Sequence, residues 1–345
     1  MTTHRTTTSH RSVHGLRRCA AMVAMLALVL AACGDADGAD GGADTLTLDW
    51  ATYNPLSLII RDQGWLEAAL ADDGIEVEWL QSAGSNRANE GLRSGALDVG
   101  STAGSAALLA RSNGSPIKTI ALYSQPEWSA IVVPDGSPID SVDDLAGTSI
   151  AATLGTDPYF FLLQALDEAG VPLDEVEVQN LQHADGRSAL EQGSVDAWAG
   201  LDPIMAAGEA ESGLELIFRD IDFNTWGFLN ATEAFLENEP ELAQLVVDAY
   251  ERARQWAADN PDETAELLAD VAGIDLEVAR ITLLERTNLD IDPIPGEIQR
   301  SVLEIVGPIF VATGDVDDQE SIDEALATLF ETSFGEAADP ARVDG

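Results

Sequence analysis

Basic residues are scarce in this sequence: 17 Lys and Arg stand against 61 Asp and Glu in 345 residues, a formal net charge of −44. Lys118 is the single lysine. Nucleic acids and anionic membranes are bound through positively charged surfaces, so both are disfavoured as partners. Hydrophobic residues make up 46% of the chain, which is enough for a sizeable core and argues against disorder. The length gives about two domains as a starting expectation.

Cysteine and histidine are also rare, with two and four residues. Cys19 and three of the histidines lie in the first 32 residues, which leaves Cys33 and His183 downstream. A domain with one cysteine has no disulfide of its own and depends on its core for stability. A histidine-rich zinc or nickel site is excluded, and a Ser-His-Asp triad would have to use His183. The sequence also lacks a phosphate loop, a nucleophile elbow and a metal cluster, so we expect no enzyme activity, metal or cofactor.

The first 32 residues predict a targeting signal. Arg11, Arg17 and Arg18 precede an apolar run, residues 19–32, which is shorter than the about 20 residues that a bilayer requires. This is the pattern of a signal peptide with small residues at its cleavage site. Leu30-Ala31-Ala32-Cys33 resembles a bacterial lipobox, in which Cys33 carries a lipid. The alternative is an ordinary secretory signal beside an incidental cysteine.

Processing at Cys33 would leave 13 basic residues against 61 acidic ones, a net charge of −48. Residues 33–44 are rich in Gly and Asp and predict a flexible acidic linker. We therefore expect an exported protein on the outer face of the cytoplasmic membrane, which touches the membrane only through its lipid anchor.

Segments typical of strands and helices alternate after residue 45. Strands are expected at 46–50, 75–80, 97–99, 117–123 and 129–133, and helices at 58–70, from 84 to 95 and from 104 onward. This alternation predicts an α/β fold with a mainly parallel sheet and helices on its faces. The C-terminal third has helical periodicity and suggests packing helices without chemistry.

A weak internal repeat points to two similar lobes. Residues 88–98 and 186–196 correspond at an offset of 98, which matches Leu92 with Leu190, Gly95 with Gly193 and Asp98 with Asp196. In both copies a glycine follows the last helical turn, as a left-handed cap requires, and a short strand comes next. Such a repeat could be chance. Otherwise it predicts two α/β lobes that face a cleft, with the ligand at the carboxyl ends of the strands.

Several motifs resemble those of aliphatic sulfonate-binding proteins of ABC importers. They occur in the order of that family from about residue 46 to about residue 315. The motifs are Tyr53-Asn54-Pro55-Leu56-Ser57, Gln63-Gly64-Trp65-Leu66-Glu67, Gly84-Ser85-Asn86, residues 100–106, Gly155-Thr156-Asp157-Pro158, residues 181–187, Val195-Asp196-Ala197-Trp198 and Gly200-Leu201-Asp202-Pro203.

The resemblance implies a type II periplasmic-binding-protein fold, which has two lobes, two crossover strands and a central ligand cleft. On this basis the first lobe would comprise residues 45–127 and 231–345, and the second residues 128–230. The resemblance also implies the permease and ATPase subunits of an ABC importer as partners.

Three helix starts could bind the anion that this resemblance implies. A sulfonate has three acceptor oxygens, and helix N-termini offer free N–H groups and partial positive charge without a lysine. We expect backbone N–H and hydroxyl groups to hold the sulfonate; the alternative is that these residues are ordinary helix caps. The candidates at these starts are Ser85, Asn86, Thr102, Ala103, Gly104, Ser105, Thr156 and Asp157.

Four further candidates lie where the chain meets the expected cleft. Tyr53 and Asn54 follow the first strand, although Asn-Pro also suits a plain turn. Trp128 and Trp226 lie near the expected crossovers, where they could wall the alkyl part of a ligand or belong to the core.

Charged and titratable candidates complete the predicted site. His183 could donate a hydrogen bond to the ligand or to the opposite lobe, or be a satisfied loop residue. Asp202 would repel a sulfonate, so it is better suited to cap a helix or to meet a ligand amine. Arg87 and Arg187 are expected mainly at the surface, although either could add charge near an anion.

Together these features predict a monomeric protein that captures aliphatic sulfonates outside the membrane and delivers them to a permease, in the service of sulfur acquisition. One alternative keeps the fold and changes the ligand to taurine, nitrate or a thiamine-precursor pyrimidine. Nitrate has no alkyl tail for aromatic side chains to contact, and a pyrimidine would need more aromatic and acidic contacts than can be assigned. An enzyme on a similar two-lobed fold is the remaining alternative.

Overall fold

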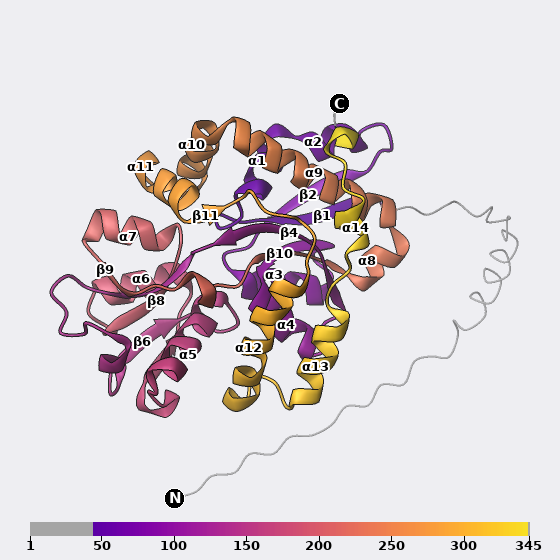
Figure 1. The fold of residues 1–345 in the computed structure, drawn as a ribbon. Coiled ribbons are helices and arrows are strands. Elements are labelled where there is room, and N and C mark those ends of the chain that lie inside the picture. The colour runs from indigo at the N-terminus through magenta and orange to yellow at the C-terminus, as the bar shows by residue number, and fades with distance from the viewer. Residues whose placement is uncertain (1–43, 344–345) are drawn as a thin grey trace, which may run out of the picture. The chain divides into compact units, whose positions relative to one another are not determined.

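Two β-sheets organise residues 44–343, the part of the chain that the computed structural model describes (Figure 1). The six-stranded sheet has the order β11-β4-β10-β3-β1-β2, and the five-stranded sheet the order β7-β6-β8-β5-β9. We call the first sheet with its helices the first lobe, and the second sheet with its helices the second lobe. The predicted signal peptide, Cys33 and the predicted linker up to residue 43 lie outside the described residues.

The strands of the first lobe come from three parts of the chain. They are β1 (Thr45–Trp50), β2 (Glu76–Gln81), β3 (Val99–Ala103), β4 (Ile117–Pro126), β10 (Gly227–Thr232) and β11 (Thr287–Asn288). The strands of the second lobe are consecutive: β5 (Ser129–Val133), β6 (Ser149–Ala152), β7 (Glu177–Asn180), β8 (Ala197–Leu201) and β9 (Glu215–Phe218).

Helices cover both sheets. The α-helices of the first lobe are α1 (Pro55–Gln63), α2 (Trp65–Leu70), α3 (Ser85–Ser94), α4 (Gly104–Ser112), α8 (Glu233–Asn238), α9 (Pro240–Asp259), α10 (Pro261–Ala272), α11 (Leu276–Arg280), α12 (Glu297–Thr313), α13 (Gln319–Thr328) and α14 (Ser333–Glu336). The second lobe has α5 (Asp157–Ala169), α6 (His183–Glu191) and α7 (Ile204–Ser212). Short helical turns are η1 (Val142–Leu145), η2 (Leu173–Glu175), η3 (Ile221–Phe223), η4 (Ile281–Glu285) and η5 (Pro340–Val343).

The expected parallel arrangement holds for three strands in each lobe. β1 pairs in parallel with β2 and β3, and β6 pairs in parallel with β7 and β8. β10 is antiparallel to β3 and β4, and β5 is antiparallel to β8 and β9. β10 and β5 depart from the prediction because each enters its sheet directly from the other lobe, and the short edge strand β11 is also antiparallel to its neighbour β4.

The chain crosses between the lobes from β4 to β5 and again from β9 to β10. The two crossings lie together, since the backbone N–H of Ser129 donates to Oδ1 of Asn224 at 2.8 Å. Residues 227–230, which the predicted boundaries include in the second lobe, pair with β3 and β4 of the first sheet. The exact division of the chain into lobes stays a prediction.

One predicted helix is two helices. The segment 58–70 was expected to be continuous, but Gly64 adopts a left-handed conformation with φ of 63° and donates its N–H to the carbonyl of Ile60. Glycine adopts this conformation without steric cost, so α1 ends there and α2 starts in a new direction. The strand expected at 97–99 lies slightly later, as β3.

The internal repeat corresponds to matching elements of the two lobes. α3 and β3 in the first lobe lie at the same offset as α6 and β8 in the second. Gly95 and Gly193 both have positive φ, 74° and 67°. Asp98 accepts hydrogen bonds from the N–H and hydroxyl of Thr47, and Asp196 accepts the same pair from Ser149. In each lobe the repeated aspartate therefore joins the start of one strand to the start of its neighbour.

Apolar packing also joins the lobes. Phe160 on α5 of the second lobe packs against Phe310 on α12 of the first, with ring centroids 4.5 Å apart, and both are fully buried. Aromatic pairs in this geometry are favourable beyond the area that they bury. Among residues 44–343, no helix is long and apolar enough to cross a membrane.

A buried carboxylate lies on β1 of the first sheet. Asp49 on β1 is 1% exposed and accepts hydrogen bonds from the N–H of Ser101 at 2.8 Å and from its hydroxyl. Burial raises the pKa of Asp49 from 3.8 to about 7, although these hydrogen bonds act in the opposite direction.

Replacement Asp49→Asn should make stability less dependent on pH. The raised pKa means that the folded protein binds this proton more tightly than the unfolded chain, so wild-type stability falls as pH rises from about 4 through 7. Asparagine keeps the acceptor for Ser101 and cannot ionise. The melting temperature of the variant should therefore exceed that of the wild type at pH 8 and differ little from it at pH 4. Asp62→Asn, on the exposed surface, should leave the melting temperature unchanged at both pH values. Equal pH dependence of variant and wild type would contradict the assignment.

Candidate functional site

Both lobes line a narrow space of about 10 Å³ between them. Tyr53 and Ser85 come from the first lobe, and Trp128 lies at the first crossing between the lobes. The second lobe contributes Thr156, Asp157, Pro158, His183 and Leu201. This volume corresponds to about one water-sized group and is far below the ~300–1,000 Å³ of pockets for drug-sized ligands, so a larger ligand requires the lobes to separate before they close on it. Six of these eight residues are among those predicted from the sequence.

Three helices begin at this space. Ser85, Asp157 and His183 are the first residues of α3, α5 and α6. The backbone N–H groups of Ser85 and His183 have no acceptor within the described part of the chain. Helix N-termini carry partial positive charge and free donors, so the site can attract a small anion although its lining contains no lysine or arginine.

Asp157 is the most heavily bonded group of the site. Its Oδ1 accepts from the hydroxyls of Ser105 at 2.5 Å and Thr225 at 2.6 Å. Its Oδ2 accepts from the indole N–H of Trp128 at 2.7 Å and from the N–H of Thr225 at 2.9 Å. Burial raises the pKa of Asp157, and the four donors oppose that shift. These bonds join the second lobe to α4 and to both crossings.

The ring of His183 is 1% exposed and is fixed by its neighbour Thr153. Thr153 donates its only hydroxyl proton to the carbonyl of Leu181 at 2.6 Å, so at 3.2 Å it can only accept from Nδ1 of His183. Nε2 therefore carries a lone pair and is an acceptor, not the donor considered from the sequence. Burial lowers the pKa of His183 to about 3, which keeps the ring neutral.

Two aromatic rings form an apolar wall. Tyr53 and Trp128 meet edge to face with centroids 5.9 Å apart, and both line the space. The Tyr53 hydroxyl donates to the carbonyl of Ser101 at 3.0 Å, and the Trp128 N–H is taken by Asp157. Their polar atoms are thus satisfied within the protein, and their rings are available to an alkyl group.

The start of α4 is occupied by contacts within the protein. The hydroxyl of Thr102 donates to the carbonyl of Ala103 and accepts from Asn230, and Thr102 is fully buried in the first sheet. The N–H of Ala103 donates to Ser85, and that of Gly104 donates to the carbonyl of Trp226. Ser105 uses its hydroxyl on Asp157 and its N–H on Thr225. None of Thr102, Ala103, Gly104 and Ser105 lines the space.

The remaining predicted residues lie around the space without lining it. Asn54 caps α1 by accepting from the N–H of Ser57, and its amide donates to Tyr250. Asn86 lines a neighbouring depression with Gly155, and Trp226 lines another beside Gln125. Arg87 is exposed, as expected, and pairs with Glu90, whereas Arg187 is only 17% exposed and pairs with Glu191 and Glu211. Ligand contact by any predicted residue stays a prediction.

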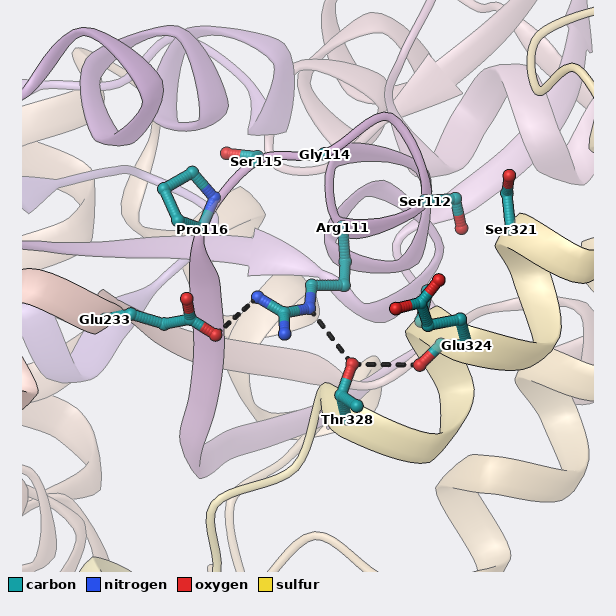
Figure 2. Close-up of a pocket in the computed structure, with 10 residues that line it drawn as sticks. Arg111, Ser112, Gly114, Ser115, Pro116, Glu233, Ser321, Glu324 and Thr328 are labelled. Carbon is teal, nitrogen blue, oxygen red and sulfur yellow. Dashed lines mark hydrogen bonds and ion pairs between the residues drawn. The ribbon is translucent and has the colours of Figure 1, made fainter.

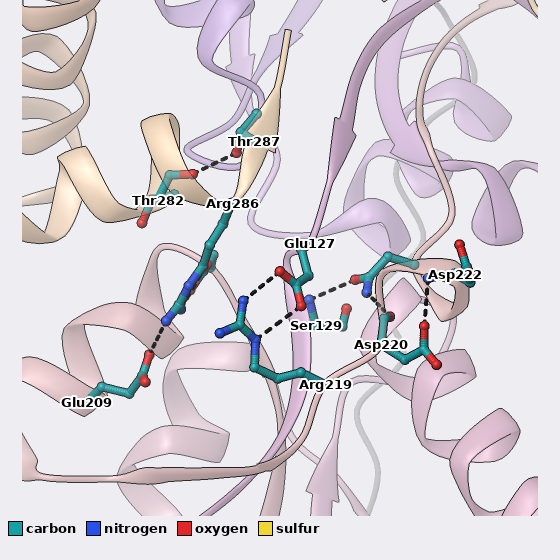
Figure 3. A network of polar contacts seen from close by, with 11 residues as sticks. Glu127, Ser129, Glu209, Arg219, Asp220, Asp222, Thr282, Arg286 and Thr287 are labelled. Carbon is teal, nitrogen blue, oxygen red and sulfur yellow. Dashed lines mark hydrogen bonds and ion pairs between the residues drawn. The ribbon is translucent and has the colours of Figure 1, made fainter.

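Asp202 belongs to a set of charged side chains across the lobes. It accepts from the N–H of Ala206, as a helix cap does, and pairs with Arg286 at 3.3 Å. Arg286 precedes β11 of the first lobe and also pairs with Glu209 on α7 at 2.7 Å (Figure 3). Burial raises the pKa of Asp202 to about 6, and the charge of Arg286 opposes this. Nearby, Arg219 pairs with Glu127 at the first crossing (Figure 3).

A further depression lies on the first lobe, away from the inter-lobe space (Figure 2). Its one arginine, Arg111, is paired with Glu233 at 2.7 Å and donates to Thr328 at 3.2 Å. Because this charge is neutralised and Glu324 also lines the depression, it is poorly suited to an anion. Among residues 44–343, no group of three or more His, Cys, Asp and Glu side chains could hold a metal ion.

Four residues of the site escaped the sequence analysis. Pro158 and Leu201 line the space, Thr153 fixes His183, and Thr225 binds Asp157. Pro158 and Leu201 lie inside quoted motifs and could have been included. Thr225 carries no sequence signal, because its role depends on a partner 68 residues away.

Comparison with known proteins places this arrangement in a class. The structure is similar to the alkanesulfonate-binding protein SsuA of Xanthomonas axonopodis pv. citri, with a TM-score of 0.73 and 21% identity, covering 82% of this chain and 97% of the other. It is also similar to the desulfurization enzyme DSZB, with a TM-score of 0.62 and 18% identity, covering 85% and 98%. The fold is therefore the two-lobed type II periplasmic-binding-protein fold predicted from the sequence.

The sequence identifies the family within that class. The family model described as NMT1/THI5 like matches residues 61–264. A Bacillus subtilis (strain 168) protein named as an aliphatic sulfonates-binding protein is 31% identical over 268 residues, which is 76% of this chain and 80% of the relative. The chain belongs to the NMT1/THI5-like family, and the predicted resemblance is confirmed.

Replacement Gly84→Ala should hinder contact between the lobes. A methyl group at residue 84 would lie 2.8 Å from Nε2 of His183 on the opposite lobe and 2.9 Å from Oδ1 of Asn86, the end of a flexible side chain on its own lobe. The extended backbone at residue 84 accepts alanine without strain. Such overpacking costs about 1–3 kcal/mol, so ligand affinity should fall about fivefold or more while the melting temperature without ligand changes little. Gly296→Ala, where a methyl group would meet nothing closer than Oε1 of Gln299 at 4.0 Å, is the matched control. Unchanged affinity in Gly84→Ala would show that the lobes need not approach this closely.

Replacement Arg286→Met should destabilise the protein more at pH 8 than at pH 5. It leaves Asp202, 3% exposed, without its cation, and an uncompensated buried charge costs about 3–5 kcal/mol. At lower pH, Asp202 can take up a proton and reduce this cost, because removing the arginine raises its pKa further. Thermal melts at both pH values measure the difference, with Arg280→Met as control, since Arg280 is 39% exposed and its partner Asp262 is exposed. A loss of equal size at the two pH values would contradict this account.

Proposed function

We propose that this protein is the substrate-binding component of an ABC importer, that it captures a small aliphatic sulfonate outside the membrane, and that it delivers the ligand to the permease. The observation that carries the proposal is the inter-lobe space, where three helices begin beside two aromatic rings. Helix N-termini suit the sulfonate oxygens, and the rings of Tyr53 and Trp128 suit a short alkyl chain. The named relative in Bacillus subtilis supports the same ligand class.

The donors for the anion follow from the hydrogen bonds that are still unused. Ser85 accepts from the N–H of Ala103 through its oxygen, so its own hydroxyl proton is available to a ligand. The N–H groups at the starts of α3 and α6 are available as well. The hydroxyls of Thr102 and Ser105 already have partners within the protein. We therefore propose Ser85 and the backbone N–H groups, in place of Thr102 and Ser105, as the principal donors to the sulfonate.

Closure of the two lobes is the proposed mechanism. A ligand that contacts both lobes favours the closed state over the open one, and only the closed state presents the surface that the permease recognises. The division into residues 45–127 with 231–345 and residues 128–230 belongs to this proposal, as do a monomeric state, export through the signal of residues 1–32 and a lipid on Cys33. We also propose that the protein has no enzyme activity, although the similar fold of DSZB shows that this architecture can support catalysis.

A thermal-shift panel tests the ligand class. Methane-, ethane- and propanesulfonate should raise the melting temperature, since a ligand at 100 times its Kd adds about 2.7 kcal/mol of stability. Nitrate and a thiamine-precursor pyrimidine should give no shift at equal concentration. The variant Ser85→Ala should reduce the sulfonate shift, and Ser94→Ala at the exposed end of the same helix should not. A shift with nitrate or the pyrimidine alone would overturn the proposal, and turnover of a bound ligand would establish an enzyme.

A further inference from the structure

The two most exposed large apolar side chains of the described residues lie on one helix. Ile298 is 68% exposed and Ile305 is 64% exposed, and both belong to α12. Val302 and Ile309 on the same helix are partly exposed. Because each residue turns an α-helix by about 100°, positions 298, 302, 305 and 309 lie within about 60° of one another and form one apolar stripe. The side chains that α12 buries lie on another side of the helix: Leu303, Val306 and Phe310.

The stripe leads into a depression of about 390 Å³ beside the two crossings. Gln125 on β4 and Trp226, which directly precedes β10, line this depression together with Ile291, Ile294 and Ile298. Ile298 belongs to both features, so the depression and the stripe are continuous. We call them the α12 surface, which consists of Trp226, Ile291, Ile294, Ile298, Val302, Ile305 and Ile309. The depression shares no lining residue with the inter-lobe space. A continuous exposed apolar surface of this kind marks an interaction site.

Acidic side chains border the α12 surface. Asp290 and Asp292 line the depression, and Glu304 is exposed on α12. None of these three carboxylates has a cationic partner within residues 44–343. Glu297 also lines the depression, and its nearest cationic atom is Nε of Arg300 at 3.9 Å. Arg300 is the only basic residue of α12, and it donates to a backbone carbonyl of α13 at 2.5 Å. The margin of the α12 surface is therefore negatively charged.

This negative margin conflicts with two possible occupants of the α12 surface. A second copy of the chain would place the same acidic margin against itself, because a symmetric contact joins identical surfaces. An anionic membrane would be repelled by the same carboxylates. A protein segment that combines apolar and basic side chains meets both properties of the surface, since it covers the isoleucines and neutralises their acidic border.

We infer that the α12 surface is the docking site for a basic amphipathic helix of a partner protein. Apolar side chains at positions i, i+3, i+4 and i+7 of that helix pack along Ile298, Val302 and Ile305, and one enters the depression against Trp226. Its lysines and arginines lie at the acidic margin. The stripe spans residues 298–309, which is about 16 Å or three turns of a helix. The occupant is thus a short helix or a helical segment of a larger partner.

Isothermal titration with designed peptides tests the inference. The probe is a peptide of about 18 residues, long enough to form a helix, with leucines at positions i, i+3, i+4 and i+7 and lysines elsewhere. It should bind the wild type, and its affinity should fall as the salt concentration rises. A scrambled peptide of the same composition, and one with glutamate in place of lysine, should each bind about tenfold more weakly or worse. Equal binding by the scrambled peptide would overturn the inference, because general charge attraction would then be sufficient.

Two sets of variants locate the peptide on α12. The double replacement Ile298→Ser and Ile305→Ser should weaken binding of the probe by about tenfold or more, since two buried apolar contacts are lost. Leu80→Ser is the matched control, because Leu80 is 42% exposed on β2, at the opposite edge of the first sheet from β11. Asp290→Asn with Glu304→Gln should reduce both the affinity and its dependence on salt. All these side chains are exposed, so the melting temperatures should stay close to that of the wild type. Unchanged affinity in the isoleucine variant would overturn the inference.

Two further measurements separate the other occupants. Reversible dimerisation of the wild type in analytical ultracentrifugation, abolished by Ile298→Ser with Ile305→Ser, would assign the α12 surface to a second copy. Binding of the wild type to phosphatidylcholine vesicles, lost in the same variant, would assign the surface to lipid. Either result would overturn the inference, whereas a monomer that ignores the vesicles and binds the basic peptide supports it.

Discussion

The four hydrogen bonds to the buried carboxylate of Asp157 hold the inter-lobe site together. They come from Ser105 on α4, Trp128 at the first crossing and Thr225 at the second, so one side chain joins the second lobe to every segment that connects it to the first. All four lone-pair positions of the carboxylate are used, which excludes it as a counter-ion for a ligand. The same bonds orient Trp128 against Tyr53 and fix the start of α5, so the apolar wall and one helix N-terminus both depend on Asp157.

An acidic protein can bind a small anion because repulsion by its surface charge and attraction by its hydrogen-bond donors act over different distances. The net charge of −44 is spread over the whole chain, and charges at the surface are screened beyond about 8–10 Å at physiological salt. Helix N-termini and hydroxyl groups act within hydrogen-bond distance. Arg286 and Arg219, which lie where the two lobes meet, are paired with Asp202 and Glu127. They therefore do not provide a general positive field. The anion site therefore depends on oriented backbone groups.

The sequence predicted the fold class and many of the residues that meet in the site, because both follow from periodicity and from the order of strands and helices. Ser85, Thr156 and His183 come together since each lies where a helix begins after a parallel strand. Thr102 and Ser105 satisfied the same pattern, yet their side chains are directed by Asn230 and Asp157, which are 128 and 52 residues away. Contacts of that range leave no local signature. The tautomer of His183 was likewise invisible, because it is set by Thr153 and Leu181 together.

Because the two crossings are adjacent, the chain follows a simple path between the lobes. β4 and β10 are antiparallel neighbours, and the second lobe leaves from the end of one and returns at the start of the other. Seen in this way, β4 and β10 are the two arms of a β-hairpin whose turn has been replaced by a complete lobe of the protein. Such a connection tolerates large changes in length, because the loop ends remain in place whatever lies between them. The binding half of the site could thus be exchanged as a unit without rearranging the sheet on which it is mounted.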